Sequence, residues 1–267
     1  MNSEIILRQK AYWEKRSSKY KDKIEGVLFK SLPGAVNNYL DKWTWSEIKN
    51  GIDCADAKKI LDLGAGYGRL SRKVVRYKPK ATLRGVDISR NYVDLYNKKL
   101  GPKHKSVVGS IDALPFKDNS FDMAFMSITL VCLLDKKRQK KALAEMIRVI
   151  KPGGCFVFIE SNKFIHRMIM LNGILGEVTR DKNGRPLIDI TPEFIENEFD
   201  RLNCKIIRKR GIPAWTFGLP IVILSDKISS SLSKDILKVI ELLGMKIGFL
   251  YKASLYFSLT GVKKSEK

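Results

Sequence analysis

The sequence is poor in the residues that bind zinc or form disulfide frameworks. It contains two histidines, His104 and His166, and four cysteines, none of which belongs to a C-x-x-C pair. These spacings do not match the usual Cys/His zinc sites, and nothing suggests paired cysteines. We therefore expect no bound metal and a reducing, cytoplasmic environment.

Long apolar runs are also lacking. Residues Met1 to Tyr20 are charged and have no apolar signal-peptide core. A spanning helix needs roughly 20 apolar residues, whereas the longest candidate, Ala214 to Leu224, is interrupted by Gly218 and Pro220. We expect a soluble protein and leave peripheral contact with an anionic membrane open.

Acidic residues are scarce relative to basic ones, with 28 Asp and Glu against 50 Lys and Arg and a net charge of +22. Such a field attracts nucleic acid, an anionic membrane surface or an acidic small molecule. The basic residues are spread along the chain, which also fits a surface that serves only solubility. Charge alone leaves these interpretations open.

What the sequence does contain is an alternation of short strand-like and longer helix-like patterns, which predicts a mostly parallel α/β sheet with helices on both faces. We expect one domain over residues 1–267, with a helical extension at 1–40 and cap segments that bind the acceptor at 162–190 and 212–250. The expected strands are Lys59–Leu63, Ala81–Asp87, Lys105–Val108, Phe121–Ile128, Cys155–Glu160, Lys205–Arg210 and Ser254–Val262, and the expected helices include Leu70–Tyr77, Ser89–Leu100, Lys136–Ile150, Phe164–Leu175, a helix capped by Thr191, and Lys234–Leu243.

A glycine-rich turn follows the first expected strand, where Gly64, Gly66 and Gly68 alternate with Ala65 and Tyr67. Glycine permits positive φ and close approach of a ligand, and the amides of the next helix favour a negative group. The G-x-G-x-G spacing, with Asp62 two residues ahead, differs from the G-x-G-x-x-G of dehydrogenases. An ordinary tight turn is the alternative.

Asp87 ends the second expected strand, 19 positions after Gly68. An acid at roughly this offset accepts both ribose hydroxyls in nucleotide-binding βαβ units, whereas the alternative is a helix N-cap. Farther along, Asp112 is placed to accept from an adenine amino group, with Ile88 and Ile111 on the two sides of the ring. The alternative there is a loop aspartate and two core isoleucines.

Four stretches, ILDLGAGYGRL, GVDIS, GSIDALPFKDNSFDMAFM and RVIKPGG, occur in this order over roughly residues 58–160. Together they resemble class I S-adenosylmethionine-dependent methyltransferases, especially the ubiquinone and menaquinone biosynthesis group with its type 11 methyltransferase domain. The resemblance implies a Rossmann-like, seven-stranded, mostly parallel sheet whose last strand runs antiparallel.

The same resemblance implies a cofactor, S-adenosyl-L-methionine, with S-adenosyl-L-homocysteine as product, and a set of contacts. Asp87 would hold the ribose, and Ser127 to Leu130 would lie near the sulfonium and the acceptor. The methionine part of the cofactor would be surrounded by Asp62, Gly64, Ala65, Gly66 and Gly68. The adenine would be surrounded by Ile88, Ile111 and Asp112.

The N-terminal residues Tyr12 to Arg16 and Tyr20 also look like that group's N-terminal segment. Tyr12, Arg16 and Tyr20 would close over the cofactor, with Arg16 pairing with its carboxylate. The alternative is a helix that packs its aromatic residues on the domain.

The acceptor is expected to be a small molecule or lipid-like. Apolar residues of the two cap segments can form an acceptor pocket or a membrane-contacting lid: Phe164, Ile165, Met168, Met170, Trp215, Phe217, Leu219, Ile221, Val222, Ile223 and Leu224. RNA methylation is the alternative suggested by the charge, although the Asn/Asp-Pro-Pro-aromatic motif is missing. A non-catalytic relative of the fold is the third hypothesis. His166 is the candidate general base, with a merely packed histidine as its alternative.

Overall fold

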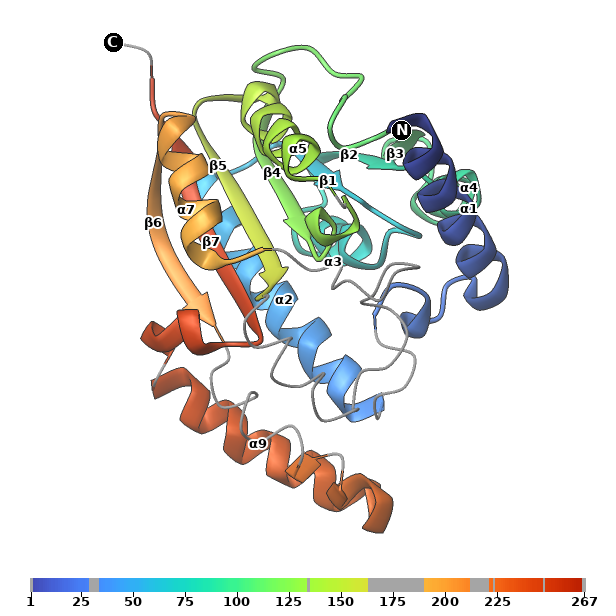
Figure 1. Ribbon diagram of the computed structural model, residues 1–267, viewed down its shortest axis with the longest axis vertical. Coiled ribbons are helices and arrows are strands. Elements are labelled where there is room, and N and C mark those ends of the chain that lie inside the picture. Colours follow the sequence, from blue (N-terminus) through green and yellow to red (C-terminus); the bar gives the residue numbers. More distant parts are fainter. Residues whose placement is uncertain are drawn as a thin grey trace.

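The computed structural model describes residues 2–28, 34–133, 135–162, 190–211, 221–222, 224–246 and 248–265. A seven-stranded sheet runs through the molecule (Figure 1). Its strands are β1 Lys59–Leu63, β2 Thr82–Asp87, β3 Lys105–Val108, β4 Phe121–Ser127, β5 Ile150–Ser161, β6 Cys204–Gly211 and β7 Tyr256–Lys263.

The strand order is β3-β2-β1-β4-β5-β7-β6. Strands β1 to β5 pair in parallel, whereas β7 is antiparallel to both β5 and β6. The predicted fold class and the antiparallel last strand are therefore confirmed. Because the chain passes from β1 outward to β3 and then returns to β4 on the other side of β1, the order reverses at β1. Open α/β sheets bind ligands outside the carboxyl ends of the strands at such a reversal.

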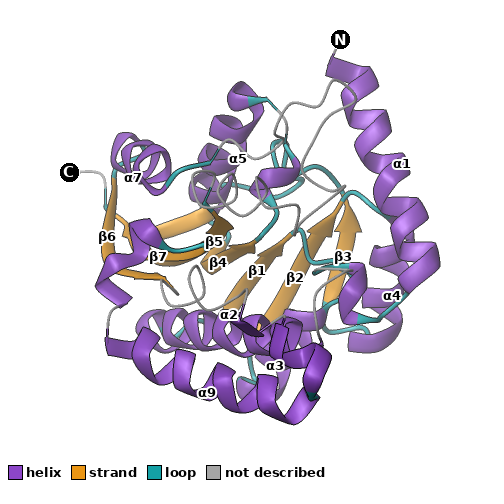
Figure 2. Ribbon diagram, turned by 60° about the horizontal axis from the view of Figure 1, so that its bottom comes forward, coloured by secondary structure: helices purple, strands orange, loops and turns teal. Residues whose placement is uncertain are grey.

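Helices cover both faces of the sheet (Figure 2). They are α1 Asn2–Tyr20, α2 Gly34–Ala55, α3 Arg69–Tyr77, α4 Arg90–Leu100, α5 Lys136–Val149, α7 Pro192–Arg201 and α9 Ser230–Lys246, with short 3₁₀ turns η1 Ile24–Gly26, η2 Leu130–Cys132 and η3 Gly248–Ala253. Alternate strand residues face opposite layers: Leu61 packs in one apolar cluster with α5 and α7, and Ile60 in another with α2 and α3.

Two helix starts are set by side-chain caps. The Oγ of Ser89 accepts from the amide of Tyr92 at the start of α4, and Thr191 accepts from the amide of Phe194 at the start of α7. The cap expected at Thr191 is confirmed.

Three elements differ from the expected ones by more than two residues. Strand β5 begins at Ile150, ahead of Gly153 and Gly154, because Ile150 already pairs with Phe121 before the register shifts. The helical segment before β1 extends to Ala55, beyond residue 40. Helix α9 starts at Ser230, four residues before the expected start. The serines of its first turn hide the apolar period in the sequence.

Part of the predicted cap lies outside the described residues. This applies to the helix expected at Phe164–Leu175, to His166, and to the apolar residues Trp215, Phe217, Leu219 and Ile223. In the part of the chain that the structure describes, no helix is both long and apolar enough to cross a membrane.

Candidate functional site

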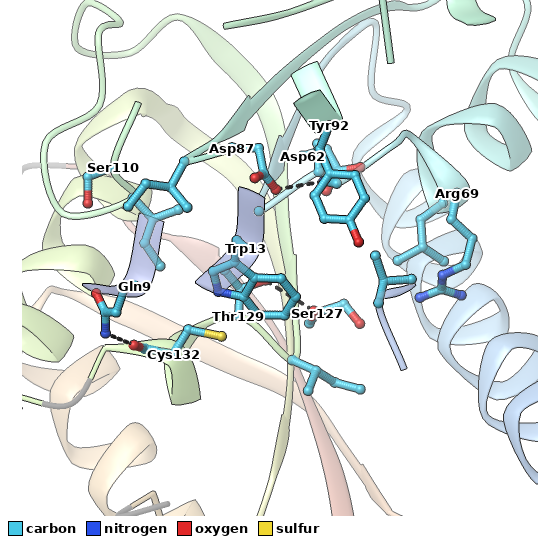
Figure 3. Close-up of a pocket in the computed structure, with 18 of the residues that line it drawn as sticks. Gln9, Trp13, Asp62, Arg69, Asp87, Tyr92, Ser110, Ser127, Thr129 and Cys132 are labelled. Atoms are coloured by element: carbon cyan, nitrogen blue, oxygen red, sulfur yellow. Dashed lines mark hydrogen bonds between the residues drawn. The ribbon is translucent and has the colours of Figure 1, made fainter. Parts of the chain in front are cut away.

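A pocket opens at the carboxyl ends of β1 to β4, where the strand order reverses (Figure 3). The loops after all four strands contribute to it, as expected for a ligand crevice in an open α/β sheet. The lining residues are Gln9, Trp13, Val27, Leu28, Asp62, Gly64, Ala65, Gly66, Arg69, Leu70, Asp87, Ile88, Tyr92, Gly109, Ser110, Ile111, Ser127, Ile128, Thr129, Cys132 and Leu133.

The glycine turn after β1 is fixed by backbone hydrogen bonds. The amides of Gly64 and Ala65 both donate to the carbonyl of Val86, at 2.8 and 3.0 Å. Gly64 has φ +73° and Gly66 has φ +52°, a backbone region that residues other than glycine rarely adopt. The turn therefore exposes its backbone to the pocket.

The two glycines have different surroundings. A Cβ added to Gly64 would lie 2.3 Å from the Thr129 Cγ2, so Gly64 is packed by protein. A Cβ on Gly66 would meet only the Val27 Cγ1, at 3.1 Å. Gly68 precedes α3, packs against Leu100 and does not line the pocket. Gly66 is thus the glycine whose missing side chain leaves room next to the pocket.

Asp87 lies in the pocket wall, and its carboxylate is held by two amides. Oδ1 accepts from the Ser89 N–H at 2.9 Å and Oδ2 from the Gly66 N–H at 2.8 Å. Ser89 is the N-cap of α4, so the alternative in which Asp87 caps that helix is wrong. Each carboxylate oxygen retains a further lone pair for a ligand hydroxyl.

Burial raises the pKa of Asp87 to about 6, although the amides of Ser89 and Gly66 work against this shift. Asp62, at the end of β1, is also buried and accepts from the Ser71 Oγ at 2.7 Å. Burial raises its pKa to about 7. The pocket thus contains two carboxylates that change charge close to neutral pH.

Ile88 and Ile111 both line the pocket, as the adenine interpretation requires. Asp112 does not line it; Arg138 holds its carboxylate through a contact of 2.6 Å between Nε and Oδ2, and Ser110 donates to it as well. Burial acts to raise the pKa of Asp112, but these hydrogen bonds outweigh it and lower the pKa. A contact between Asp112 and adenine stays a prediction.

Helix α1 reaches the pocket through Gln9 and Trp13, which lie four positions apart and hence on one face. Gln9 donates to the carbonyl of Cys132 and accepts from Arg138. Neither residue was predicted, because the polar and aromatic side chains of α1 show no clear apolar stripe. The sequence therefore carried no signal that could have identified them.

Tyr12, Arg16 and Tyr20 are not among the lining residues. The Arg16 guanidinium is buried and donates to Tyr12 and to the carbonyls of Glu25 and Leu28, at 2.8, 2.8 and 2.5 Å. It therefore ties α1 to η1 and to the residues that follow it. Contacts of these three residues with a cofactor stay predictions.

After β4 the chain makes a strained turn at the pocket. Ile128 has φ +54°, which is unusual for a β-branched residue, and its amide donates to the Ile159 carbonyl at 2.8 Å. The neighbouring Ser127 lines the pocket with its hydroxyl buried and without a hydrogen-bond partner among the described residues.

The segment after this turn is held by Glu160. This side chain is fully buried at the end of β5 and accepts from the Val131 amide at 3.1 Å and the Ser161 amide at 2.8 Å. Burial raises the pKa of Glu160 to about 7. Nothing in the sequence predicted this role, because Glu160 stands at the end of an otherwise apolar strand and matches no motif.

Arg69 is the one cationic side chain among the described residues that line the pocket. It starts α3, directly after the glycine turn, and its guanidinium pairs with Asp41 of α2. In Figure 3, Arg69 and Ser110 lie on opposite sides of the pocket, with Asp62 and Asp87 between them.

Comparison with known proteins gives the same assignment as the motifs. Residues 60–154 match the family model of a methyltransferase domain. The matched domain runs from β1 into β5 and so contains every strand whose carboxyl end forms the pocket, which confirms the resemblance drawn from the sequence.

Curated relatives match the same region. The ubiquinone/menaquinone biosynthesis C-methyltransferase UbiE of Vibrio cholerae is 37% identical over 123 residues, 42% of this chain and 45% of the relative. The protein of that name from Francisella philomiragia is 37% identical over 131 residues, 45% and 49% of the two chains. The chain thus spans a little under half the length of the curated relatives that it matches.

Solved structures share the fold over most of the length of the chain. Geranyl diphosphate C-methyltransferase from Streptomyces coelicolor A3(2) has a TM-score of 0.61 at 11% identity, covering 94% of this chain and 98% of that one. The cyclase SpnF has a TM-score of 0.63 at 15% identity, covering 98% and 97%. A cyclase among these structures shows that the fold by itself does not fix the reaction.

Proposed function

We propose that the pocket binds S-adenosyl-L-methionine and that the chain transfers the cofactor's methyl group to a small-molecule or lipid-like acceptor. The observation that carries this proposal is the Asp87 carboxylate, fixed by two amides beside the glycine turn and turned into the pocket wall. Two adjacent ribose hydroxyls match the two oxygens of such a carboxylate.

The remaining lining residues fit the other parts of this cofactor. Ile88 and Ile111 supply apolar surfaces for adenine, and Gly66 leaves room for the methionine chain. Arg69 is placed to pair with the cofactor's carboxylate, because it is a cation beside the glycine turn on the side away from Ser110. Binding would draw the guanidinium partly away from Asp41.

When bound, the cofactor supplies a methyl group that is already activated on a positively charged sulfur. The protein's contribution is then to align the acceptor and exclude water, an effect that provides about 7–11 kcal/mol in well-oriented reactions. Ser127, Ile128 and Thr129 form the wall on the acceptor side, held in place by β5 and Glu160.

A small or lipid-like acceptor is supported by the apolar character of this end of the pocket. Val27, Leu28 and Ile128 line the pocket and also pack in an apolar cluster with Val222, Leu237 and Ile240. The relatives named for ubiquinone and menaquinone biosynthesis, and the structural neighbour that methylates geranyl diphosphate, point in the same direction.

Two measurements test the proposal. Calorimetry should show binding of S-adenosyl-L-homocysteine, with at least tenfold weaker binding by Asp87→Asn. Incubation with radiolabelled cofactor and fractionated cell extract should then place the label in the lipid or small-molecule pool. Absence of cofactor binding would overturn the assignment, and label in RNA would overturn only the acceptor class.

The proposed pairing of Arg69 with the cofactor's carboxylate is tested separately. Arg69→Met should weaken S-adenosyl-L-homocysteine but leave 5′-methylthioadenosine, which lacks the amino-acid carboxylate, unchanged. Equal losses for the two ligands would show that Arg69 acts only on the shape of the turn.

A further inference from the structure

Five exposed aliphatic side chains occur between residues 221 and 239, in the helical stretch 221–246 that is interrupted at Ser229. Ile221, Leu224, Ile228, Leu232 and Val239 are 56, 61, 80, 42 and 58% exposed. Large apolar groups exposed in a row, in contrast to single ones, mark an interaction surface. We call these five residues the aliphatic stripe.

The stretch consists of two helical segments that meet at Ser229. Ser229 N–H donates to the Ser225 carbonyl at 2.9 Å, and the Ser229 carbonyl and Oγ accept from the amides of Ser233 and Ser231 at the start of α9, both at 3.2 Å. Leu224 and Ile228 are four positions apart in the first segment, and Leu232 and Val239 are seven apart in α9, so each pair shares a helix face. Both segments pack on one apolar cluster, through Val222 and Leu237, and the exposed side chains lie on the sides away from it.

The opposite face of the same stretch is packed on the protein. Val222, Leu237 and Ile240 are buried in a cluster with Leu28 and Tyr256. Figure 1 shows α9 as the outermost element at its end of the molecule, beyond α2. The stripe is therefore a second apolar face, separate from the one that holds the helix in place.

The charges around the stripe indicate what covers it. Lys227 and Lys234 are exposed beside it, and the whole chain has a net charge of +22. Two acids also lie beside the stripe: Asp226 accepts from the Ser233 Oγ at 2.8 Å, and the Asp235 carboxylate pairs with Lys238 at 2.8 Å. A second copy of the chain would bring together two molecules that each carry a net charge of +22, and nucleic acid offers no apolar surface for five aliphatic side chains.

From this combination we infer that the aliphatic stripe is a docking surface for an anionic lipid bilayer. Aliphatic side chains enter the boundary between headgroups and acyl chains, and neighbouring lysines contact anionic headgroups. The opposite face of this helix packs on the cluster that contains Val27, Leu28 and Ile128 of the pocket. The pocket would thus lie about one helix diameter, roughly 10–12 Å, from the bilayer surface.

Vesicle co-sedimentation of the full chain tests this inference, and its outcome does not depend on methyl transfer. The protein should bind vesicles of phosphatidylcholine with phosphatidylglycerol, bind vesicles of pure phosphatidylcholine far more weakly, and lose affinity at 0.5 M salt, roughly an ionic strength at which surface charges are screened within a few ångströms.

A double variant, Leu224→Ser with Ile228→Ser, should lower the partition coefficient about tenfold or more, since two exposed aliphatic groups are removed. Leu7→Ser is the matched control, because Leu7 is 64% exposed on α1 and outside the stripe. Both variants should keep the wild-type affinity for S-adenosyl-L-homocysteine without vesicles, which separates a failure of docking from a failure of the proposed function.

Several results would overturn the inference. They are no binding of the wild type to anionic vesicles, equal binding to neutral ones, an unchanged partition coefficient in the double variant, or an equal loss in Leu7→Ser. A dimer in sedimentation that the double variant dissolves would assign the stripe to a second copy of the chain instead.

Discussion

At the scale of single residues, the site depends on a carboxylate that is ionised only above mildly acidic pH. Burial raises the pKa of Asp87 to about 6 and that of Asp62 to about 7. In the proposed complex, ribose hydroxyls donate to the ionised form of Asp87, so binding would require that this carboxylate has lost its proton. The proposal therefore links cofactor affinity to pH in the range where most assays are run.

The affinity for S-adenosyl-L-homocysteine should consequently fall as the pH drops below about 6, by up to about tenfold per pH unit. Calorimetry between pH 5 and pH 8 measures this. In Asp87→Asn the step near pH 6 should vanish, while any step near pH 7 from Asp62 should persist. A wild-type affinity that is constant from pH 5 to 8 would contradict the role of Asp87.

The glycine turn supports a second residue-level prediction, which compares two glycines of similar φ. Gly66→Ala should weaken cofactor binding with a modest loss of stability, because its Cβ meets only Val27. Gly64→Ala should destabilise the fold by about 1–3 kcal/mol more, because its Cβ overlaps Thr129. Urea unfolding together with calorimetry separates these effects; the reverse ranking of stabilities would contradict the assignment.

At the scale of elements, the sequence predicted what depends on local chemistry. The glycine turn, the strand before it and the position of Asp87 follow from spacing within 30 residues, and so does the Thr191 cap. Contacts between distant segments were not predictable in the same way. Gln9 donates a hydrogen bond to η2, Arg69 pairs with Asp41, and Arg138 pairs with Asp112. No sequence pattern links the two partners of any of these contacts.

Helix α1 illustrates the limit. The N-terminal segment was expected near the pocket, and it does line it, but through Gln9 and Trp13. The face that a helix presents depends on the segment it packs against, which here is η1 with the residues after it, where two carbonyls bind Arg16. Without an apolar stripe, the sequence could not fix the rotation of the helix.

The junction of β5 and η2 carries an element-scale prediction. Glu160 has a pKa of about 7 in the fold because it is buried, against an ordinary value of 4.5. Its ionisation therefore lowers the stability of the folded state as the pH rises from about 5 to 7. Glu160→Gln should lack this contribution.

Urea unfolding at pH 5 and pH 7.5 tests this. The difference in free energy of unfolding between Glu160→Gln and wild type should shift in favour of the variant at the higher pH. Ser161→Ala serves as the control, since it removes one neutral partner of Glu160 and leaves the charge. A difference that does not change with pH would contradict a buried, titrating Glu160.

At the scale of the whole molecule, the net charge of +22 opposes compaction through self-repulsion. Raising the salt concentration from 10 to 150 mM should therefore raise the melting temperature, since screening reduces this repulsion. The surface ion pairs that salt also weakens contribute little each. Differential scanning calorimetry measures the shift, and a lower melting temperature in salt would contradict it.

The place of β7 has a consequence for how the protein is made. Strand β6 pairs with β7 and, within the described sheet, with no other strand, and β7 comprises Tyr256–Lys263. A nascent chain that has left the ribosome only as far as residue 250 can form the pocket strands β1 to β4, yet β6 has no neighbour to pair with. The half of the sheet that forms the pocket can thus assemble during synthesis, whereas β6 can pair only after Tyr256–Lys263 has been made.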